Sequence, residues 1–255
     1  MMLFHDQTWP GLLILLAAAF WAGAQNALAG GGSFVTLPAL MFTGLDARAA
    51  NIASTIALFP GQVTTGLVGR KLADGAGGLS FLQLVAISLA GGAVGAVLLL
   101  ATPAAFFARM VPWLVLFATG VFAWGAFLRR NGEARAPIKA PATALIQFAI
   151  SIYGGYFGGG IGFLMLAALT LAGHGVRVAG STKNLLASAM NASAVAIFVF
   201  IARPDWVKVA VVCLGAIAGG AIGGQMLKRV NERALQVVVI LIGAALTIGL
   251  FVRSA

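Results

Sequence analysis

Two stretches decide the fold of this 255-residue chain, Ala29-Gly30-Gly31-Gly32-Ser33-Phe34 and Phe157-Gly158-Gly159-Gly160-Ile161-Gly162. They interrupt two apolar runs, residues 11–42 and 142–172, and each run is longer than the about 20 helical residues that cross a bilayer core. Three successive glycines break a helix and leave backbone N–H groups free. We therefore predict that each run is a helical hairpin that dips into a membrane and returns, with the glycines near its tip.

The composition assigns the chain to the membrane. Hydrophobic residues make up 61% of it, charged residues 9%, and the mean hydropathy is +1.02. A soluble domain carries about a quarter charged residues, and a disordered chain is far less apolar. The fold class predicted is therefore an all-α polytopic membrane protein, with the lipid bilayer as its surroundings.

The net charge of +10 raises the question of a nucleic-acid partner. The basic residues instead occupy short gaps between apolar runs, where topology signals belong, so we predict no nucleic-acid binding. The single cysteine and the two distant histidines, His5 and His174, give no metal site. No phosphate-binding glycine motif with lysine is present either, and we expect no cofactor.

The order and spacing of two glycine motifs predict an internal duplication, and the alternative is that glycine-rich membrane helices resemble one another by composition alone. The two glycine triplets are 128 residues apart, and Ala90-Gly91-Gly92-Ala93-Val94-Gly95 recurs at the same offset as Ala218-Gly219-Gly220-Ala221-Ile222-Gly223. This predicts a first transmembrane repeat over 1–130, a polar cytoplasmic linker over 131–141 and a second repeat over 142–255. Internal repeats of this kind are typical of transporters. About three further spans follow each hairpin, over 52–68, 81–101, 113–128, 185–201, 207–227 and 235–252.

Charge bias favours inverted over parallel repeats. With Lys183 set aside, the hairpin arrangement places ten basic residues on one side and five on the other. In the parallel arrangement, with four ordinary spans per half, nine basic residues lie on one side and six on the other. By the positive-inside rule, we predict inverted repeats with the linker in the cytoplasm and both termini outside.

Backbone groups that are free at membrane depth are tolerated where they line a cavity. A helix that begins after the glycines would direct its positive end at an anion. We therefore predict that amides near Gly31, Gly32, Gly159 and Gly160 bind anionic oxygens. The alternative is that these glycines only permit close helix packing. Close packing is also our interpretation of the G-x-x-x-G pairs in the 90–95 and 218–223 motifs. The packing partner of these Gly-rich helices could be a second copy of the chain, in a homodimer.

The polar residues that follow each hairpin are candidate ligands. Lys183 would supply positive charge to the site. Inserting a lysine at the bilayer centre costs about 2.5–3.5 kcal/mol of free energy, so such a residue normally has a function. The alternative is that its side chain extends to the membrane interface. No carboxylate falls in a predicted membrane core, which favours an anionic substrate. The neutral candidates are equally consistent with hydrogen bonding between helices, and they are Ser33, Asn51, Thr55, Gln62, Asn184 and Asn191.

The sequence resembles the sulfite exporter TauE/SafE family of membrane anion permeases. The likeness rests on Gly30-Gly31-Gly32-Ser33 through Pro38, Ala49-Ala50-Asn51 with Ser54-Thr55, Tyr156-Phe157-Gly158-Gly159-Gly160, and Ala179-Gly180-Ser181-Thr182-Lys183-Asn184. The resemblance implies transport of sulfite, sulfoacetate or related sulfonates across a bacterial inner membrane. The second half departs from the first because no proline corresponds to Pro38.

We therefore expect a multi-pass secondary transporter of small sulfur-containing anions, in which the two halves rock about one site in alternating access. A passive anion channel with the same site is the first alternative. A membrane-embedded enzyme is the second, but it would need a nucleophile–base pair or a metal site in the core, and the sequence offers neither. We predict that the chain is not an enzyme.

Overall fold

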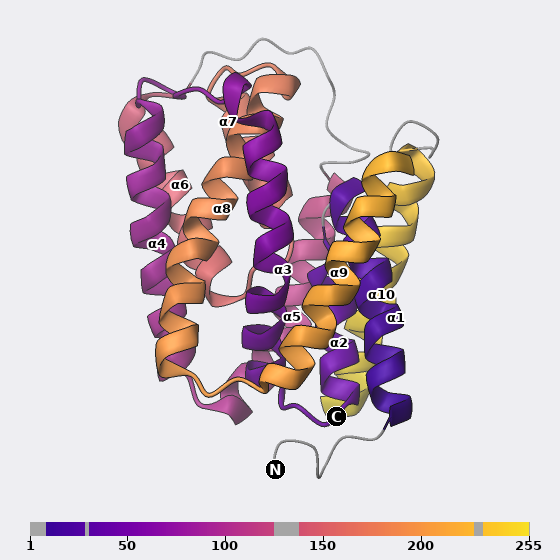
Figure 1. The fold of residues 1–255 in the computed structure, drawn as a ribbon. Coiled ribbons are helices and arrows are strands. Elements are labelled where there is room, and N and C mark those ends of the chain that lie inside the picture. The colour runs from indigo at the N-terminus through magenta and orange to yellow at the C-terminus, as the bar shows by residue number, and fades with distance from the viewer. Residues whose placement is uncertain (1–8, 29–30, 125–137, 227–231, 255) are drawn as a thin grey trace.

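The computed structural model describes residues 9–28, 31–124, 138–226 and 232–254, and these are arranged as ten α-helices and one 3₁₀ turn with no strand (Figure 1). Gly30 and residues 131–137 of the predicted linker lie outside the described residues. The helices are α1 (Trp9–Leu28), α2 (Ser33–Phe42), α3 (Ala47–Gly69), α4 (Phe81–Ala101), α5 (Ala104–Ala123), α6 (Ala140–Tyr156), α7 (Ile161–Leu171), α8 (Val176–Ile201), α9 (Trp206–Met226) and α10 (Glu232–Ser254); the 3₁₀ turn η1 is Arg70–Leu72.

Local sequence explains several helix boundaries. Asp46 caps α3 by accepting a hydrogen bond from the backbone N–H of Ala49. Ser80 and Gln83 form a reciprocal capping box at the start of α4. Pro103 stands between α4 and α5, after the capping residue Thr102 of α4. Because proline has no backbone N–H, it cannot continue the hydrogen bonds of α4.

The glycine triplets break both long runs, as predicted. Gly31 lies between α1 and α2 with φ 80°, and Gly158 and Gly160 lie between α6 and α7 with φ 80° and 75°. These left-handed conformations suit glycine and few other residues. The missing counterpart of Pro38 does not disturb the second hairpin, since α7 extends over 11 residues and α2 over 10.

The two hairpins turn back toward opposite ends of the bundle (Figure 1). At the upper end of the view, Ile138 before α6 bonds to the carbonyl of Leu171 at the end of α7. At the lower end, Arg48 near the start of α3 donates to the carbonyls of Leu100 and Thr102 at the end of α4. This is the arrangement that the hairpin topology describes, while the full inverted-repeat relation and the sidedness stay predictions.

Helix packing in one half recurs in the other. The hairpin arm α1 packs along α9, and its counterpart α6 packs along α4. The contact of α3 with α9 matches that of α8 with α4, and α3 meets α8 while α5 meets α10. Exchanging the halves therefore reproduces the same set of principal helix pairs.

Glycines allow the closest of these contacts. A Cβ atom on Gly91 or Gly95 of α4 would collide with α6, and one on Gly219 of α9 would collide with the carbonyl oxygen of Phe20 in α1. These faces are already occupied within the chain. The homodimer predicted through the Gly-rich helices is therefore not supported.

Three described helices are long and apolar enough to cross a membrane, over Phe81–Ala101, Ala104–Ala123 and Arg177–Ile201. Large apolar side chains also lie exposed on the outside of the bundle, among them Trp113, Phe200 and Leu214. Lipid is the surrounding in which such a surface is stable. The all-α membrane fold is confirmed.

Candidate functional site

A cavity of about 100 Å³ lies where the two halves meet. Helices α3 and α8 form its walls. The two glycine breaks, the first residues of α2 and α7, and Asn26 near the end of α1 form the rest. The lining residues are Asn26, Gly31, Ser33, Ser54, Thr55, Leu58, Gln62, Thr65, Phe157, Gly158, Gly160, Ile161, Gly162, Phe163, Lys183, Asn184, Ala187 and Asn191.

Eight of the eleven residues predicted from the sequence line this cavity, namely Gly31, Ser33, Thr55, Gln62, Gly160, Lys183, Asn184 and Asn191. The other three lie beside it. The Asn51 side chain is buried and donates to the carbonyl of Tyr156 at 3.1 Å. Gly32 packs against the carbonyl of Ala22, and Gly159 packs between the rings of Phe157 and Phe34. These three residues contribute contacts at the hairpin tips, and the ligand role of all eleven stays a prediction.

The cavity walls come from positions that correspond in the two predicted repeats. On α3 and α8 the lining residues form four pairs, each 129 residues apart in the sequence. The pairs are Ser54 with Lys183, Thr55 with Asn184, Leu58 with Ala187, and Gln62 with Asn191. The site therefore lies where a two-fold relation between the halves would have its axis, which is also where transporters of repeated architecture bind their substrates.

Lys183 is the charged residue of the cavity. Its Nζ points to the start of α7 and lies 3.3 Å from the position that a Cβ atom on Gly162 would occupy. Neither an ion pair nor a hydrogen bond joins Lys183 to any residue in the described part of the chain, and no Asp or Glu is among the lining residues. An ammonium group in this position lacks the counter-ion that a buried cation normally has.

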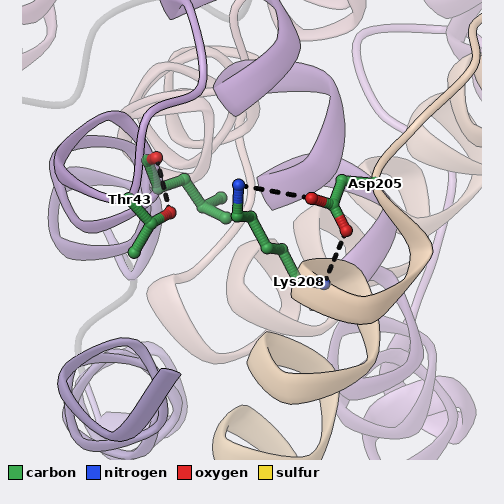
Figure 2. Close-up of polar contacts among 4 residues, drawn as sticks. Thr43, Asp205 and Lys208 are labelled. Atoms are coloured by element: carbon green, nitrogen blue, oxygen red, sulfur yellow. Dashed lines mark hydrogen bonds and ion pairs between the residues drawn. The ribbon is translucent and has the colours of Figure 1, made fainter. Parts of the chain in front are cut away.

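Lys208, in contrast to Lys183, is paired with the carboxylate of Asp205 (Figure 2). Its Nζ lies 3.2 Å from Oδ2 of Asp205, and its backbone N–H donates to Oδ1 of the same carboxylate at 3.1 Å. Thr43 at the end of α2 lies nearby in Figure 2 and donates to the carbonyl of Leu40. Lys208 therefore adds no free charge, whereas Lys183 does.

The start of α7 adds to the positive potential of the site. The N–H groups of Phe163 and Leu164 bond to the carbonyl of Gly160 at 3.1 and 3.5 Å. The N–H groups of Ile161 and Gly162, which belong to the first turn, have no described partner. The positive end of the helix dipole and Lys183 therefore face the same small space.

Amide side chains connect the two halves beside the cavity. Nδ2 of Asn191 donates to Oε1 of Gln62, and the hydroxyl of Ser188 donates to the Gln62 carbonyl at 3.0 Å. The Thr55 hydroxyl bonds to the carbonyl of Asn51 at 2.9 Å. Oδ1 of Asn191 is buried without a donor. These residues thus combine the two roles that the sequence left open, helix pairing and the lining of a site.

Sequence reasoning missed several lining residues. Ser54 and Thr65 share a helical face with Thr55, Leu58 and Gln62, so helical spacing could have identified them. Asn26 and Phe163 reach the cavity because of the way the hairpin tips fold back, and no local pattern in the sequence indicates this position.

A second cavity of about 300 Å³ adjoins the first and shares Asn26, Leu58 and Thr65 with it. It extends between Pro60 of α3 and Ile217 of α9. This part of α3 runs toward the upper end of the bundle in Figure 1. Toward the lower end, the space beneath the hairpin tips is filled by a buried apolar cluster to which α2, α3, α5 and α8 contribute.

The chemistry of the described residues is that of a binding site. No group of three or more His, Cys, Asp or Glu residues that could hold a metal ion occurs among them. What the cavity offers is one unpaired ammonium, a helix N-terminus, and hydroxyl and amide groups. Groups of these kinds can bind anionic oxygens by charge and hydrogen bonding.

Comparison with known proteins agrees with this chemistry. The profile of the family described as sulfite exporter TauE/SafE matches residues 15–250. A probable membrane transporter protein of Haemophilus influenzae is 26% identical over 238 residues, which cover 92% of both chains. A second, ORF9 of a Sinorhizobium species, is 26% identical over 96% of this chain and 94% of its own. YfcA of Escherichia coli K12, also a probable membrane transporter protein, is 24% identical over 94% of this chain and 90% of its own. The protein is therefore a membrane transporter, and it belongs to the sulfite exporter TauE/SafE family.

Proposed function

We propose that the protein is a secondary transporter of small sulfur-containing anions, such as sulfite, sulfoacetate or related sulfonates, in a bacterial inner membrane. The observation that carries this proposal is the free ammonium of Lys183 in a cavity whose described lining residues include no carboxylate. An anionic oxygen would supply the missing counter-charge. The family supports the chemical class of the substrate.

Binding would use three kinds of group. Lys183 contributes charge, and the N–H groups of Ile161 and Gly162 contribute the end of a helix dipole. Ser33, Thr55, Gln62, Asn184 and Asn191 contribute hydroxyl and amide groups around them. The cavity of about 100 Å³ exceeds the roughly 10–15 Å³ that one water molecule requires on the same measure, so it has room for a small ion.

Transport would proceed by alternating access. The site lies between the halves, so a rocking motion of one half against the other would open it first to one side and then to the other. The adjoining cavity beside α9 supports an opening toward the upper end, and the apolar cluster supports closure toward the lower end. We propose that the upper end is cytoplasmic, because Arg70, Lys71, Lys139 and Arg177 all belong to segments at that end.

A proteoliposome experiment tests the function. The purified protein is reconstituted, and uptake of labelled sulfite is measured with and without unlabelled sulfite trapped inside. A carrier gives saturable uptake that internal sulfite accelerates. A passive channel with the same site would give flux without this counterflow, and the absence of flux for every anion tested in a well-folded preparation would refute transport of this class.

A further inference from the structure

Helix α3 contains a weak point that the corresponding part of α8 lacks. Pro60 lies inside α3 and has no backbone N–H, so the helical hydrogen bond to the carbonyl of Ile56 is missing. Gly61 follows it, and the space around its Cβ position is open. The residues of α8 at the same offset of 129 are Ala189 and Met190, which favour a continuous helix. A helix bends most easily at a point such as Pro60-Gly61.

Two threonines weaken the turn that follows. The Thr64 hydroxyl donates to the carbonyl of Pro60 at 3.0 Å, and the Thr65 hydroxyl donates to the carbonyl of Gly61 at 2.9 Å. Side-chain bonds of this kind compete with the backbone hydrogen bonds and often bend helices. Residues 61–69, which we call the upper segment of α3, can therefore pivot about Pro60-Gly61.

The part of α3 below this point is fixed to both hairpins. Asn51 donates to the carbonyl of Tyr156, just before the second glycine triplet, at 3.1 Å. The Ser54 hydroxyl bonds to that of Thr36 in the first hairpin at 2.6 Å, and both Asn51 and Ser54 are buried. The upper segment can therefore move while the lower part stays in place.

The upper segment is held against α8 by contacts around Gln62. The Gln62 side chain accepts a hydrogen bond from Asn191, and its backbone carbonyl accepts one from Ser188 at 3.0 Å. Gly66, one turn further, lies so close to α8 that a Cβ atom on it would be 2.9 Å from the Ser188 hydroxyl oxygen. Because Gln62 and Thr65 also line the anion cavity, the segment that makes these contacts closes one side of the cavity.

The upper segment has free space on its other side. Pro60, Gly61 and Thr64 line the adjoining cavity of about 300 Å³, whose described lining comes from α1, α3 and α9. Figure 1 shows α3 between α8 and α9, and it contacts both. A swing of the segment away from α8 therefore carries it toward this cavity.

We propose that the upper segment of α3 is a gate over the anion site, hinged at Pro60-Gly61 and held closed through Gln62. This inference rests on the proposed transport function, and it adds to the rocking motion a local movement that opens the site toward the upper end. The segment is about 13 Å long at ~1.5 Å per residue, so a bend of about 20° displaces its end by roughly 5 Å.

Distances between spin labels test the hinge in the purified full-length protein, in a Cys213→Ser background. One pair of labels spans the upper end of the bundle, from α3 to α6, and a second pair spans the lower end, from α2 to α8. The labelled positions are exposed, and they are Val68 with Leu145 and Phe42 with Phe200. Gln62→Leu removes the bond to Asn191 and should raise the population with the longer upper distance about fivefold, the factor that one neutral hydrogen bond provides. The lower distance should stay the same.

A stiffened helix tests what the gate does for transport. Pro60→Ala restores the backbone donor, and Gly61→Ala favours the helix further. The double variant should slow sulfite turnover in proteoliposomes roughly tenfold or more, because a straight α3 disfavours the bent, open state. Neither residue lines the anion cavity, so sulfite affinity in calorimetry should stay at the wild-type value.

Helix α5 offers a matched control for this variant. It also contains a proline, Pro112, and a glycine, Gly120, whose Cβ position has open space around it. The double substitution Pro112→Ala with Gly120→Ala should leave sulfite turnover unchanged. If the double variant of α3 does not fold, Gly61→Ala alone takes its place, since its methyl group enters open space.

The outcomes separate the gate from rigid rocking and from the function itself. An unchanged upper distance in Gln62→Leu overturns the gate, and so does a lower distance that shortens as the upper one lengthens, since rigid rocking moves both ends. Wild-type turnover in the stiffened α3 variant also overturns it, as does a loss of sulfite affinity equal to the loss of turnover. If the wild-type protein moves no anion, the proposed function fails, while the two distances still decide whether α3 bends at Pro60-Gly61.

Discussion

Replacing Lys183 by methionine removes the charge of the site while keeping a long, flexible apolar stem. An ion in the cavity would lie about 4 Å from Nζ, a separation at which two unit charges interact by about 4 kcal/mol at an effective dielectric constant of about 20. Water that shares the cavity reduces this figure, so we expect a loss of about 2–4 kcal/mol. The corresponding drop in affinity is roughly 30- to 1,000-fold.

The loss should appear in binding without a loss of folding. Isothermal titration of methanesulfonate into the purified variant measures the affinity, and thermal unfolding in detergent checks the fold. Lys183 has no described partner, so its replacement breaks no hydrogen bond and leaves no orphaned carboxylate. We expect the melting temperature to stay level or to rise, because a half-buried charge without a partner is itself destabilising.

An exposed lysine provides the control. Lys71 in the 3₁₀ turn after α3 is exposed, and Lys71→Met makes the same change in net charge. Its effect on affinity should be small and should disappear in moderate salt, since exposed charges are screened. Wild-type affinity in Lys183→Met, or an equal loss in both variants, would refute the assignment of Lys183 to the substrate.

Two further changes test the packing near the site, and one tests topology. Gly162→Ala places a methyl group 3.3 Å from Nζ of Lys183 and should weaken anion binding several-fold in calorimetry, whereas Gly180→Ala on α8, with open space at its Cβ position, should leave affinity unchanged. Gly219→Leu drives a side chain into α1 at Phe20 and should lower the melting temperature by several degrees or prevent folding, and a stable variant would contradict the tight contact of α1 with α9. Single cysteines at positions 71 and 203, in a Cys213→Ser background, should react with impermeant reagents from opposite sides of the membrane; labelling from one side would reject the hairpin topology.

The sequence was sufficient to predict the helical hairpins, because the signal for them is local. Three glycines in an apolar run too long for one span leave a helix break as the simplest solution, and Gly31, Gly158 and Gly160 adopt conformations that other residues avoid. The helix-pairing role of Gly91 and Gly219 was equally readable, since the spacing of small residues is a property of one helix face.

The composition of the site was harder to predict, because it depends on how distant segments meet. Asn51 has the residue type of a ligand, yet its amide is used by the carbonyl of Tyr156 at the second hairpin. Lys183 could have extended to the membrane surface, and only the position of Gly162 shows that it turns inward. The pairing of Gln62 with Asn191 similarly requires α3 and α8 to lie side by side, which no pattern within either helix states.

The predicted duplication pairs Ser54 with Lys183, and the two side chains differ in their chemistry. At position 54 the Ser hydroxyl bonds to Thr36 of α2 at 2.6 Å, while at position 183 a lysine is left free. The hairpin tips differ in the same sense. The amide of Gln25 donates to the carbonyl of Gly31 at 3.1 Å, and the N–H of Phe34 in α2 bonds to the same carbonyl at 3.0 Å, whereas the N–H of Gly162, the residue of α7 that corresponds to Phe34, has no described partner.

An anion that needs both charge and free donors would therefore lie off the axis, closer to the second hairpin than to the first. The first hairpin, where the Gln25 amide and the Thr36 hydroxyl already bond to neighbouring groups, would gain less from the ion. The second hairpin changes its interactions most when the site fills. If filling the site triggers the rocking motion, we expect the trigger to act through the Gly158–Gly160 tip, where positive backbone φ angles on both sides of Gly159 allow the start of α7 to reorient at low steric cost.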